Sequence, residues 1–80
     1  MSKSLRTNRH RVLCELLVEA RNKAGLIQAE LARQLGKPQS YVSKIEIGER
    51  GIDLVEFIAL TGAMGADPVR ILKAVRKAKP

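Results

Sequence analysis

Residues 25–50 read GLIQAELARQLGKPQSYVSKIEIGER, and their pattern predicts two short helices joined by a tight turn. The first helix covers about residues 28–35 and ends at Gly36, because glycine favours the position just after a helix. The second runs from Pro38 to about Ile47, because the first position of a helix needs no N–H and accepts proline. The stretch is therefore predicted to be a helix, a turn and a second helix.

Small and β-branched residues at fixed offsets from the glycine predict how these two helices pack. Ala32, four residues before the glycine, is small enough to let the helices approach closely, and Val42 and Ile45 anchor the second helix from below. These offsets are those of a helix-turn-helix, which holds its second helix outward to enter the major groove of DNA. Since a glycine after a helix is common, only the complete set of residues supports this interpretation.

Three further helices are predicted around this pair. One precedes it over residues 8–23, with Thr7 or Asn8 as its cap, and two follow it, capped by Asp53 and Asp67. The side chains expected in the core are Val12, Leu13, Leu16, Leu17, Ala20, Ala24, Leu31, Ala32, Leu35, Val42, Ile45, Leu54, Phe57, Leu60, Thr61, Met64, Leu72 and Val75. Because no stretch alternates polar and apolar residues, the sequence predicts an all-α fold of five helices.

Length and composition point to one small domain, with its core at about residues 8–76. The chain has 80 residues, of which 45% are hydrophobic and 29% charged, the usual balance of a globular protein. One Tyr and one Phe are too few aromatic rings for a base-stacking platform that binds single-stranded nucleic acid. No apolar run approaches the roughly 20 residues that span a bilayer, and we expect a cytoplasmic protein without a membrane partner.

The basic residues are concentrated at the two ends of the chain. The net charge is +7, with +4 in residues 1–11, +5 in residues 70–80 and −2 in the remainder. A strongly basic domain suggests a polyanionic partner. Basic ends either grip phosphates, as arms, or only keep the protein in solution, so charge alone leaves the function open.

The sequence lacks the residue sets typical of enzymes and metal sites, and we expect no catalytic residue, no cofactor and no metal. It contains no nucleophile paired with a base and an orienting acid, and no glycine-rich phosphate loop. His10 has no second His or Cys at ligand spacing. Cys14 lies about 120° from the centre of the apolar stripe on its helix, so we expect it half exposed and without a redox role.

The central stretch resembles the Cro/CI-type helix-turn-helix family, also called XRE-like regulators, and the likeness covers roughly residues 12–73. The resemblance is carried by GLIQAELA at residues 25–32, LG at 35–36, QSYVSKIE at 39–46 and GER at 48–50. It implies a five-helix fold of the lambda-repressor type and the binding of double-stranded DNA. Arg21 and Glu46 match an ion pair of the family that ties the first helix to the third.

The resemblance also implies which side chains face the bases. Gln39 and Ser40 match the first turn of the recognition helix, and Ser43 and Lys44 match its next exposed turn. Glutamine can make a two-point contact with adenine, lysine donates to guanine, and serine can donate or accept. Outside the motif, the same four residues would be read as a solvated helix face.

Contacts to the DNA backbone are expected from other positions. Gln28 matches a glutamine that grips a phosphate, and Tyr41 matches a position that often meets the sugar-phosphate backbone. Ile47 stands where asparagine or arginine often contacts a phosphate, and we expect Arg50 to substitute for it. Ile27 replaces the usual threonine cap of the second helix, at a cost of about 1 kcal/mol if nothing replaces it. Pro38 likewise replaces a common serine or threonine and removes a possible hydroxyl contact.

These observations favour a sequence-specific regulator of transcription, most simply a repressor that occupies an operator. The alternative is an antitoxin-like protein-interaction module of the same fold, which neutralises a partner such as a toxin and can autorepress. Val55 and Ile58 face away from the predicted core or lie at its edge, and we expect them in a homodimer contact. Such a dimer would place two recognition helices about one DNA turn apart.

Overall fold

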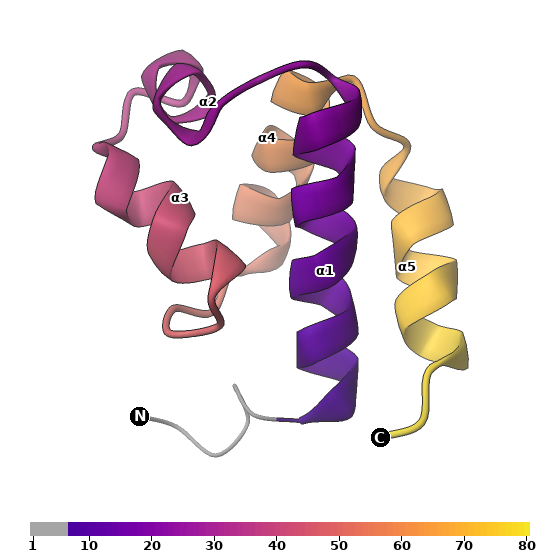
Figure 1. The fold of residues 1–80 in the computed structure, drawn as a ribbon. Helices are drawn as coiled ribbons and strands as arrows, with labels where there is room; N and C mark the ends of the chain where they lie inside the picture. Colours follow the sequence, from indigo (N-terminus) through magenta and orange to yellow (C-terminus); the bar gives the residue numbers. More distant parts are fainter. Residues whose placement is uncertain (1–6) are drawn as a thin grey trace.

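The computed structural model describes residues 7–80 and contains five α-helices with no strand in that range. They are α1 (Asn8–Lys23), α2 (Gln28–Gln34), α3 (Gln39–Glu46), α4 (Leu54–Met64) and α5 (Pro68–Lys77) (Figure 1). The predicted all-α, five-helix fold is confirmed. Lys3 and Arg6 of the expected basic arm lie outside the described residues.

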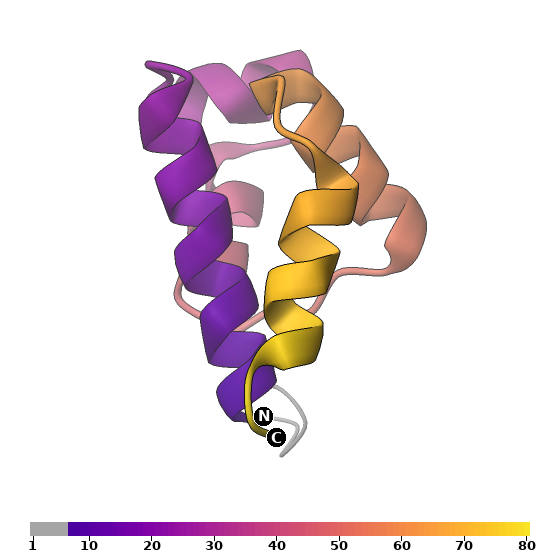
Figure 2. The ribbon, with the colours of Figure 1, turned by 90° about the vertical axis from the view of Figure 1, so that its right-hand side faces the viewer.

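Helix α1 occupies the middle of the molecule. It packs against α5 on one side and against α3 and α4 on the other, while α2 lies across one end (Figure 1). Helices α1 and α5 run antiparallel, so that the end of the chain returns to the start of α1 (Figure 2). None of the five helices of residues 7–80 combines the length and apolar character required of a membrane span.

Side-chain caps fix where three of the helices begin. Of the two candidates for α1, Thr7 is the cap, and its Oγ1 accepts a hydrogen bond from the His10 N–H at 3.1 Å. Asp53 caps α4 by accepting from the Glu56 N–H at 2.7 Å, and Asp67 caps α5 by accepting from the Val69 N–H. Each cap satisfies a backbone donor that the helix itself leaves unpaired.

Helix α2 begins without such a cap because Ile27 occupies the capping position. Glu30, three residues later, reaches back and accepts a hydrogen bond from the Ile27 N–H at 3.0 Å. This is one half of a capping box, which satisfies the donor that precedes the helix. The carboxylate of Glu30 therefore stabilises the turn that leads into α2.

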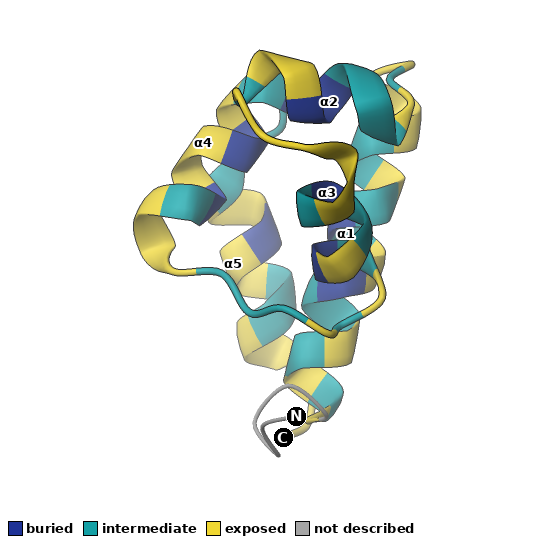
Figure 3. Ribbon diagram, turned by 90° about the vertical axis from the view of Figure 1, so that its left-hand side faces the viewer, coloured by how far each residue is buried: buried dark blue, intermediate teal, exposed yellow. Residues whose placement is uncertain are grey.

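One apolar cluster forms the core, with all five helices contributing (Figure 3). Its buried members are Leu17, Leu31, Ala32, Val42, Ile45, Phe57, Leu60, Met64 and Ile71. Thr61 is also buried, and its hydroxyl donates to the carbonyl oxygen of Phe57 at 3.0 Å. Most of the predicted core is confirmed, including the stripes of α2 and α3.

Four core predictions were wrong. Leu72 is 46% exposed and Ile71 is buried in its place, because α5 turns its Ile71 side toward α1 and α4. Leu54 is exposed because it is the first residue of α4, and Ala24 is exposed after the end of α1. Cys14 was expected to be half exposed, but it is buried.

The burial of Cys14 follows from the central place of α1. Neighbouring helices cover α1 on several sides, so the buried arc is wider than its apolar stripe. The Cys14 thiol faces α3 and donates to the carbonyl oxygen of Ile45 at 3.3 Å. Burial raises the pKa of this thiol above its ordinary value, which disfavours the thiolate.

The two ends of the described chain are joined by side chains of the first turn of α1. Arg9 donates from Nε to the Ala78 carbonyl and from Nη2 to the Arg76 carbonyl, both at 3.0 Å. Asn8 donates from Nδ2 to the Lys79 carbonyl at 2.7 Å. A cation at the C-terminal end of α5 also complements the helix dipole, so Arg9 contributes to holding α5 in place.

Candidate nucleic-acid interface

The turn between α2 and α3 sets the angle at which α3 leaves the body. Gly36 adopts a left-handed conformation with φ of 67°, and the Lys37 N–H donates to the Ala32 carbonyl at 2.9 Å. Ala32 is itself buried, so the two helices approach closely at this point. Residues 36–38 of this turn are exposed (Figure 3).

Helix α3 is held by one side and presents the other. Val42 and Ile45 are only 1% and 3% exposed and pack into the core. On the outward side Ser40 and Lys44 are exposed and Ser43 is half-buried. The structure thus places these three predicted residues together on one accessible helix surface.

The start of α3 differs by one residue from the prediction. Pro38 was expected at the first helical position, but its ψ of 157° is extended and it occupies the capping position instead. Its carbonyl accepts the Tyr41 N–H at 3.0 Å, which closes the first turn. Gln39 is therefore the first helical residue, and its side chain is exposed.

A chain of polar contacts connects α1, α2 and α3 behind this surface. Arg21 donates from Nε to Glu46 at 2.7 Å and from Nη2 at 3.2 Å, which confirms the predicted ion pair. Gln28 donates to the same Glu46 carboxylate at 2.7 Å. The Oε1 of Gln28 accepts from the Gln39 amide at 3.3 Å. This series of hydrogen bonds therefore ends at Gln39, the first residue of α3, which is exposed.

A second cluster joins α3 to the loop after it and to α4. The Tyr41 hydroxyl donates to Glu56 at 2.9 Å, and Nη2 of Arg50 pairs with the same carboxylate at 3.0 Å. The Arg50 guanidinium also lies over the Tyr41 ring, 4.6 Å from its centroid. Tyr41 and Arg50, both predicted to contact the DNA backbone, are brought together and engaged with Glu56.

These contacts change the protonation of the cluster. The N–H of Asp53, then Arg50 and Tyr41, all donate to Glu56 and lower its pKa from 4.5 to about 2. Burial and the hydrogen bond to Glu56 raise the pKa of Tyr41, and the Glu56 carboxylate raises the pKa of Arg50. The cluster is thus a charged Glu56 held by three donors, one from α3 and two from the loop that follows it.

Two exposed residues beside α3 were not among the predicted site residues. Lys37 lies just before the helix, with its Nζ 5.3 Å from the centroid of the Tyr41 ring. Ile47, at the end of the helix, is 67% exposed on the same side as Ser40 and Lys44. In the sequence, the position of Lys37 directly after the turn glycine was the signal that could have identified it. The exposure of Ile47 depends on where α3 ends.

Comparison with known proteins agrees with this geometry. A family model described as helix-turn-helix matches residues 17–71, more than half of the chain. The chain belongs to the XRE-like helix-turn-helix family. No curated protein matched the chain in sequence.

Two solved structures illustrate the relationship. An XRE-family like protein from Pseudomonas syringae pv. tomato is 42% identical, with a TM-score of 0.85, over 98% of this chain and 95% of its own. The restriction-modification controller protein C.AhdI from Aeromonas hydrophila is 34% identical, with a TM-score of 0.68, over 74% of this chain and 86% of its own. The XRE-like family and these neighbours support a DNA-binding transcription regulator.

Proposed function

We propose that this XRE-like chain is a sequence-specific repressor that reads double-stranded DNA with the outward face of α3. The observation that carries the proposal is the arrangement of α3, buried at Val42 and Ile45 and accessible on the opposite side. A helix fits the major groove, where each base pair presents a distinct pattern of donors and acceptors. Occupying an operator in this way blocks polymerase and needs no catalytic group.

The residues on the outward face have the chemistry for base recognition. Lys44 donates to guanine O6 or N7, and the Gln39 amide can make a two-point contact with adenine. Ser40 and Ser43 can donate or accept, although the Ser43 hydroxyl already donates to the Ser40 carbonyl at 3.2 Å. We assign base contact chiefly to Gln39 and Lys44, with the serines beside them.

Other side chains are proposed to hold the DNA backbone. Gln28 acts in two ways, since it contacts phosphate at the start of α2 and orients Gln39 through their shared hydrogen bond. Lys37 is exposed and free to donate to a phosphate next to Tyr41. Arg50 is 41% exposed at its side chain, so it can reach a phosphate while paired with Glu56. Such contacts fix register and affinity and carry no base specificity themselves.

A second copy of the chain is proposed to bind through α4. Val55 is 78% exposed and Ile58 50% exposed, and Leu54 beside them is exposed as well. Residues three and four apart lie on one helix face, so the three side chains form a single apolar patch. Burying this patch against the same patch of a second copy is favourable. The resulting two-fold dimer suits an operator with two half-sites.

The antitoxin-like alternative is supported by a different surface. Residues 70–80 contain five basic residues and no acidic one, and α5 lies on the opposite side of α1 from α3 (Figure 1). A protein partner is thus able to bind there without covering the DNA-reading face. A purified partner that binds the chain and leaves operator binding intact would support this role.

Selection of bound duplexes from a random library tests the proposed function. We expect a shared sequence motif, and binding of the selected duplex should weaken with salt by a log–log slope of about −0.9 per phosphate contact. Random duplexes measured in the same salt series give the electrostatic part alone. A selection that yields no motif, with equal affinity for random duplexes, would refute sequence-specific recognition.

A further inference from the structure

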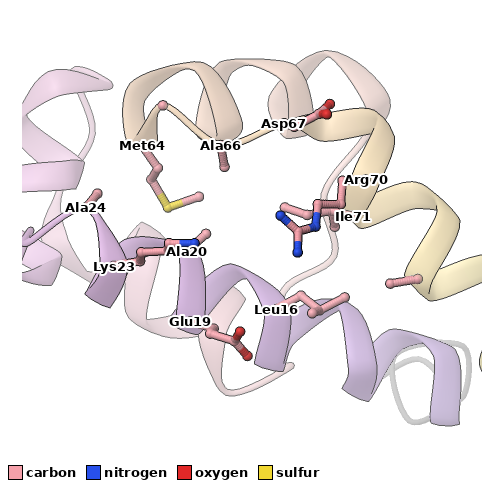
Figure 4. Close-up of a pocket in the computed structure, with 12 residues that line it drawn as sticks. Leu16, Glu19, Ala20, Lys23, Ala24, Met64, Ala66, Asp67, Arg70 and Ile71 are labelled. Carbon is pink, nitrogen blue, oxygen red and sulfur yellow. The ribbon is translucent and has the colours of Figure 1, made fainter.

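A groove between α1 and α5 lies outside the DNA-reading face. It has a volume of about 630 Å³, and its apolar lining comes from Leu16, Ala20, Met64, Ile71 and Ala74. Figure 4 shows Met64 reaching into it from the end of α4 and Leu16 facing it from α1. Small side chains at Ala20 and Ala74 leave the space between the two helices unfilled.

The charges of this groove are arranged asymmetrically. The guanidinium of Arg70 lies in the hollow and Lys23 also lines it from α1, while the carboxylates of Glu19 and Asp67 lie at its margins (Figure 4). The Asp67 carboxylate already accepts the Val69 N–H as the cap of α5. A cation is therefore presented to an occupant of the groove, and one of the two acids is engaged elsewhere.

The basic character continues along α5 beyond the groove. A second depression, of about 430 Å³, shares Asp67, Arg70 and Ala74 with the first and is also lined by Val69, Lys73 and Lys77. Within residues 7–80, neither Arg70 nor these two lysines forms an ion pair. The three cations follow one side of α5 next to an apolar hollow.

This surface faces away from the recognition helix. Viewed from the side of α5, the helices α1 and α5 are in front and α3 lies behind them (Figure 2). One straight duplex held by α3 therefore lies on the far side of the body from Arg70 and Lys77. The basic side of α5 is not explained by the DNA contact proposed for α3.

We infer that the groove between α1 and α5 docks an acidic amphipathic helix of a partner protein. Apolar side chains of that helix fill the hollow, and its carboxylates pair with Arg70, Lys73 and Lys77. The stretch of α5 from Arg70 to Lys77 is about 10 Å long, which is the length of two turns of a docked helix. A second nucleic acid would use the cations but leave the apolar hollow in contact with water, so an acidic protein helix fits better.

A labelled synthetic peptide tests this inference in the absence of DNA. The probe is an 18-residue helical peptide with leucines on one face and glutamates on both margins, and its binding is followed by fluorescence anisotropy. We expect Arg70→Glu with Lys73→Glu to weaken binding about tenfold or more, since each 1.4 kcal/mol of lost ion pairing is tenfold. The matched variant, Arg33→Glu with Lys37→Glu, changes the net charge equally on α2 and its turn and should bind as wild type.

Two further measurements separate the groove from general charge attraction. Ala74→Leu fills the hollow without changing any charge, and it should weaken peptide binding while circular dichroism and operator binding stay as in wild type. Equal binding by all variants, or equal binding of a peptide with lysines in place of glutamates, would overturn the inference. The inference would also be overturned if a random duplex displaced the peptide from the Lys44→Ala variant, because the surface would then be a nucleic-acid site. None of these outcomes bears on how α3 reads DNA.

Discussion

The side-chain amide of Gln28 donates a hydrogen bond of 2.7 Å to the Glu46 carboxylate, 18 positions further along the chain. Because Glu46 also accepts two hydrogen bonds from Arg21, the start of α2 is tied to the end of α3 and to α1. Gln28 was predicted only to contact DNA, yet it also supports α3 through Glu46. Its loss should therefore affect both stability and binding.

Gln28→Ala is predicted to lower the free energy of unfolding by about 1–2 kcal/mol, since it removes a hydrogen bond to a charged group. It should also weaken binding to every duplex, because a phosphate contact carries no sequence information, and any change of base preference should be confined to the position read by Gln39, which Gln28 orients. Denaturant unfolding and affinities for several duplexes measure the two effects. Gln34→Ala, an exposed glutamine of the same helix, is the control. Wild-type affinity of Gln28→Ala for all of these duplexes would contradict the phosphate role.

Glu56 should make stability fall in acid. Its folded-state pKa of about 2 lies below the ordinary 4.5, so the unfolded chain binds the proton first as pH decreases. The stabilisation is thus fully present above about pH 4.5 and is lost as pH falls toward 2. Unfolding free energies measured across this window should converge for wild type and Glu56→Gln.

The matched control for this titration is Glu49→Gln. Glu49 is exposed and forms no ion pair among residues 7–80. Its variant should keep the pH dependence of wild type, whereas Glu56→Gln should flatten it. If Glu56→Gln retained the whole acid-induced loss between pH 4.5 and 2, the contacts with Arg50 and Tyr41 would not stabilise the fold.

Gly36→Ala tests the turn between α2 and α3. An added Cβ meets no atom within 4 Å, so the cost comes only from the left-handed backbone, at about 1 kcal/mol or somewhat more. Gly62→Ala, in a helical and equally open position of α4, should instead be stabilising by about 0.5–1 kcal/mol. Thermal or denaturant unfolding of both variants checks the prediction. If Gly36→Ala left the free energy of unfolding unchanged, the left-handed backbone of this turn would tolerate a side chain without strain.

The proposed dimer predicts a specific change in sedimentation. Val55→Asp with Ile58→Asp places charge on the apolar patch of α4, so the double variant should sediment as a monomer at concentrations where wild type is dimeric. Ile47→Asp, at a comparably exposed apolar residue just after α3, should leave the dimer intact. Identical sedimentation of the double variant and wild type would rule out the patch as the contact.

Local sequence signals predicted most of the fold for physical reasons. Capping residues such as Asp53 and the glycine after α2 act over a few positions, so their effect can be read from neighbours in the chain. The Arg21–Glu46 pair was predicted from the family resemblance and is confirmed. The buried face of α5 was predicted wrongly, because Leu72 and Ile71 both have helical spacing to Val75 and the sequence alone does not choose between them.

The site was predicted less completely because its support depends on tertiary contacts. The carboxylate of Glu56 lies 15 positions from Tyr41, and no local pattern links the two. The burial of Cys14 likewise depends on α3 covering a side of α1 that its own apolar stripe does not mark. The exposed residues of α3 were easier to predict, since exposure follows from the helical period once Val42 and Ile45 are placed in the core.

The affinity of Lys44→Ala for a selected operator and its single-base variants tests most directly whether the outward side of α3 reads bases. We predict that the variant loses discrimination at one base position, by about 1–3 kcal/mol, and keeps its preferences at the others. An unchanged preference at every position, with wild-type affinity throughout a salt series, would contradict base recognition by this helix.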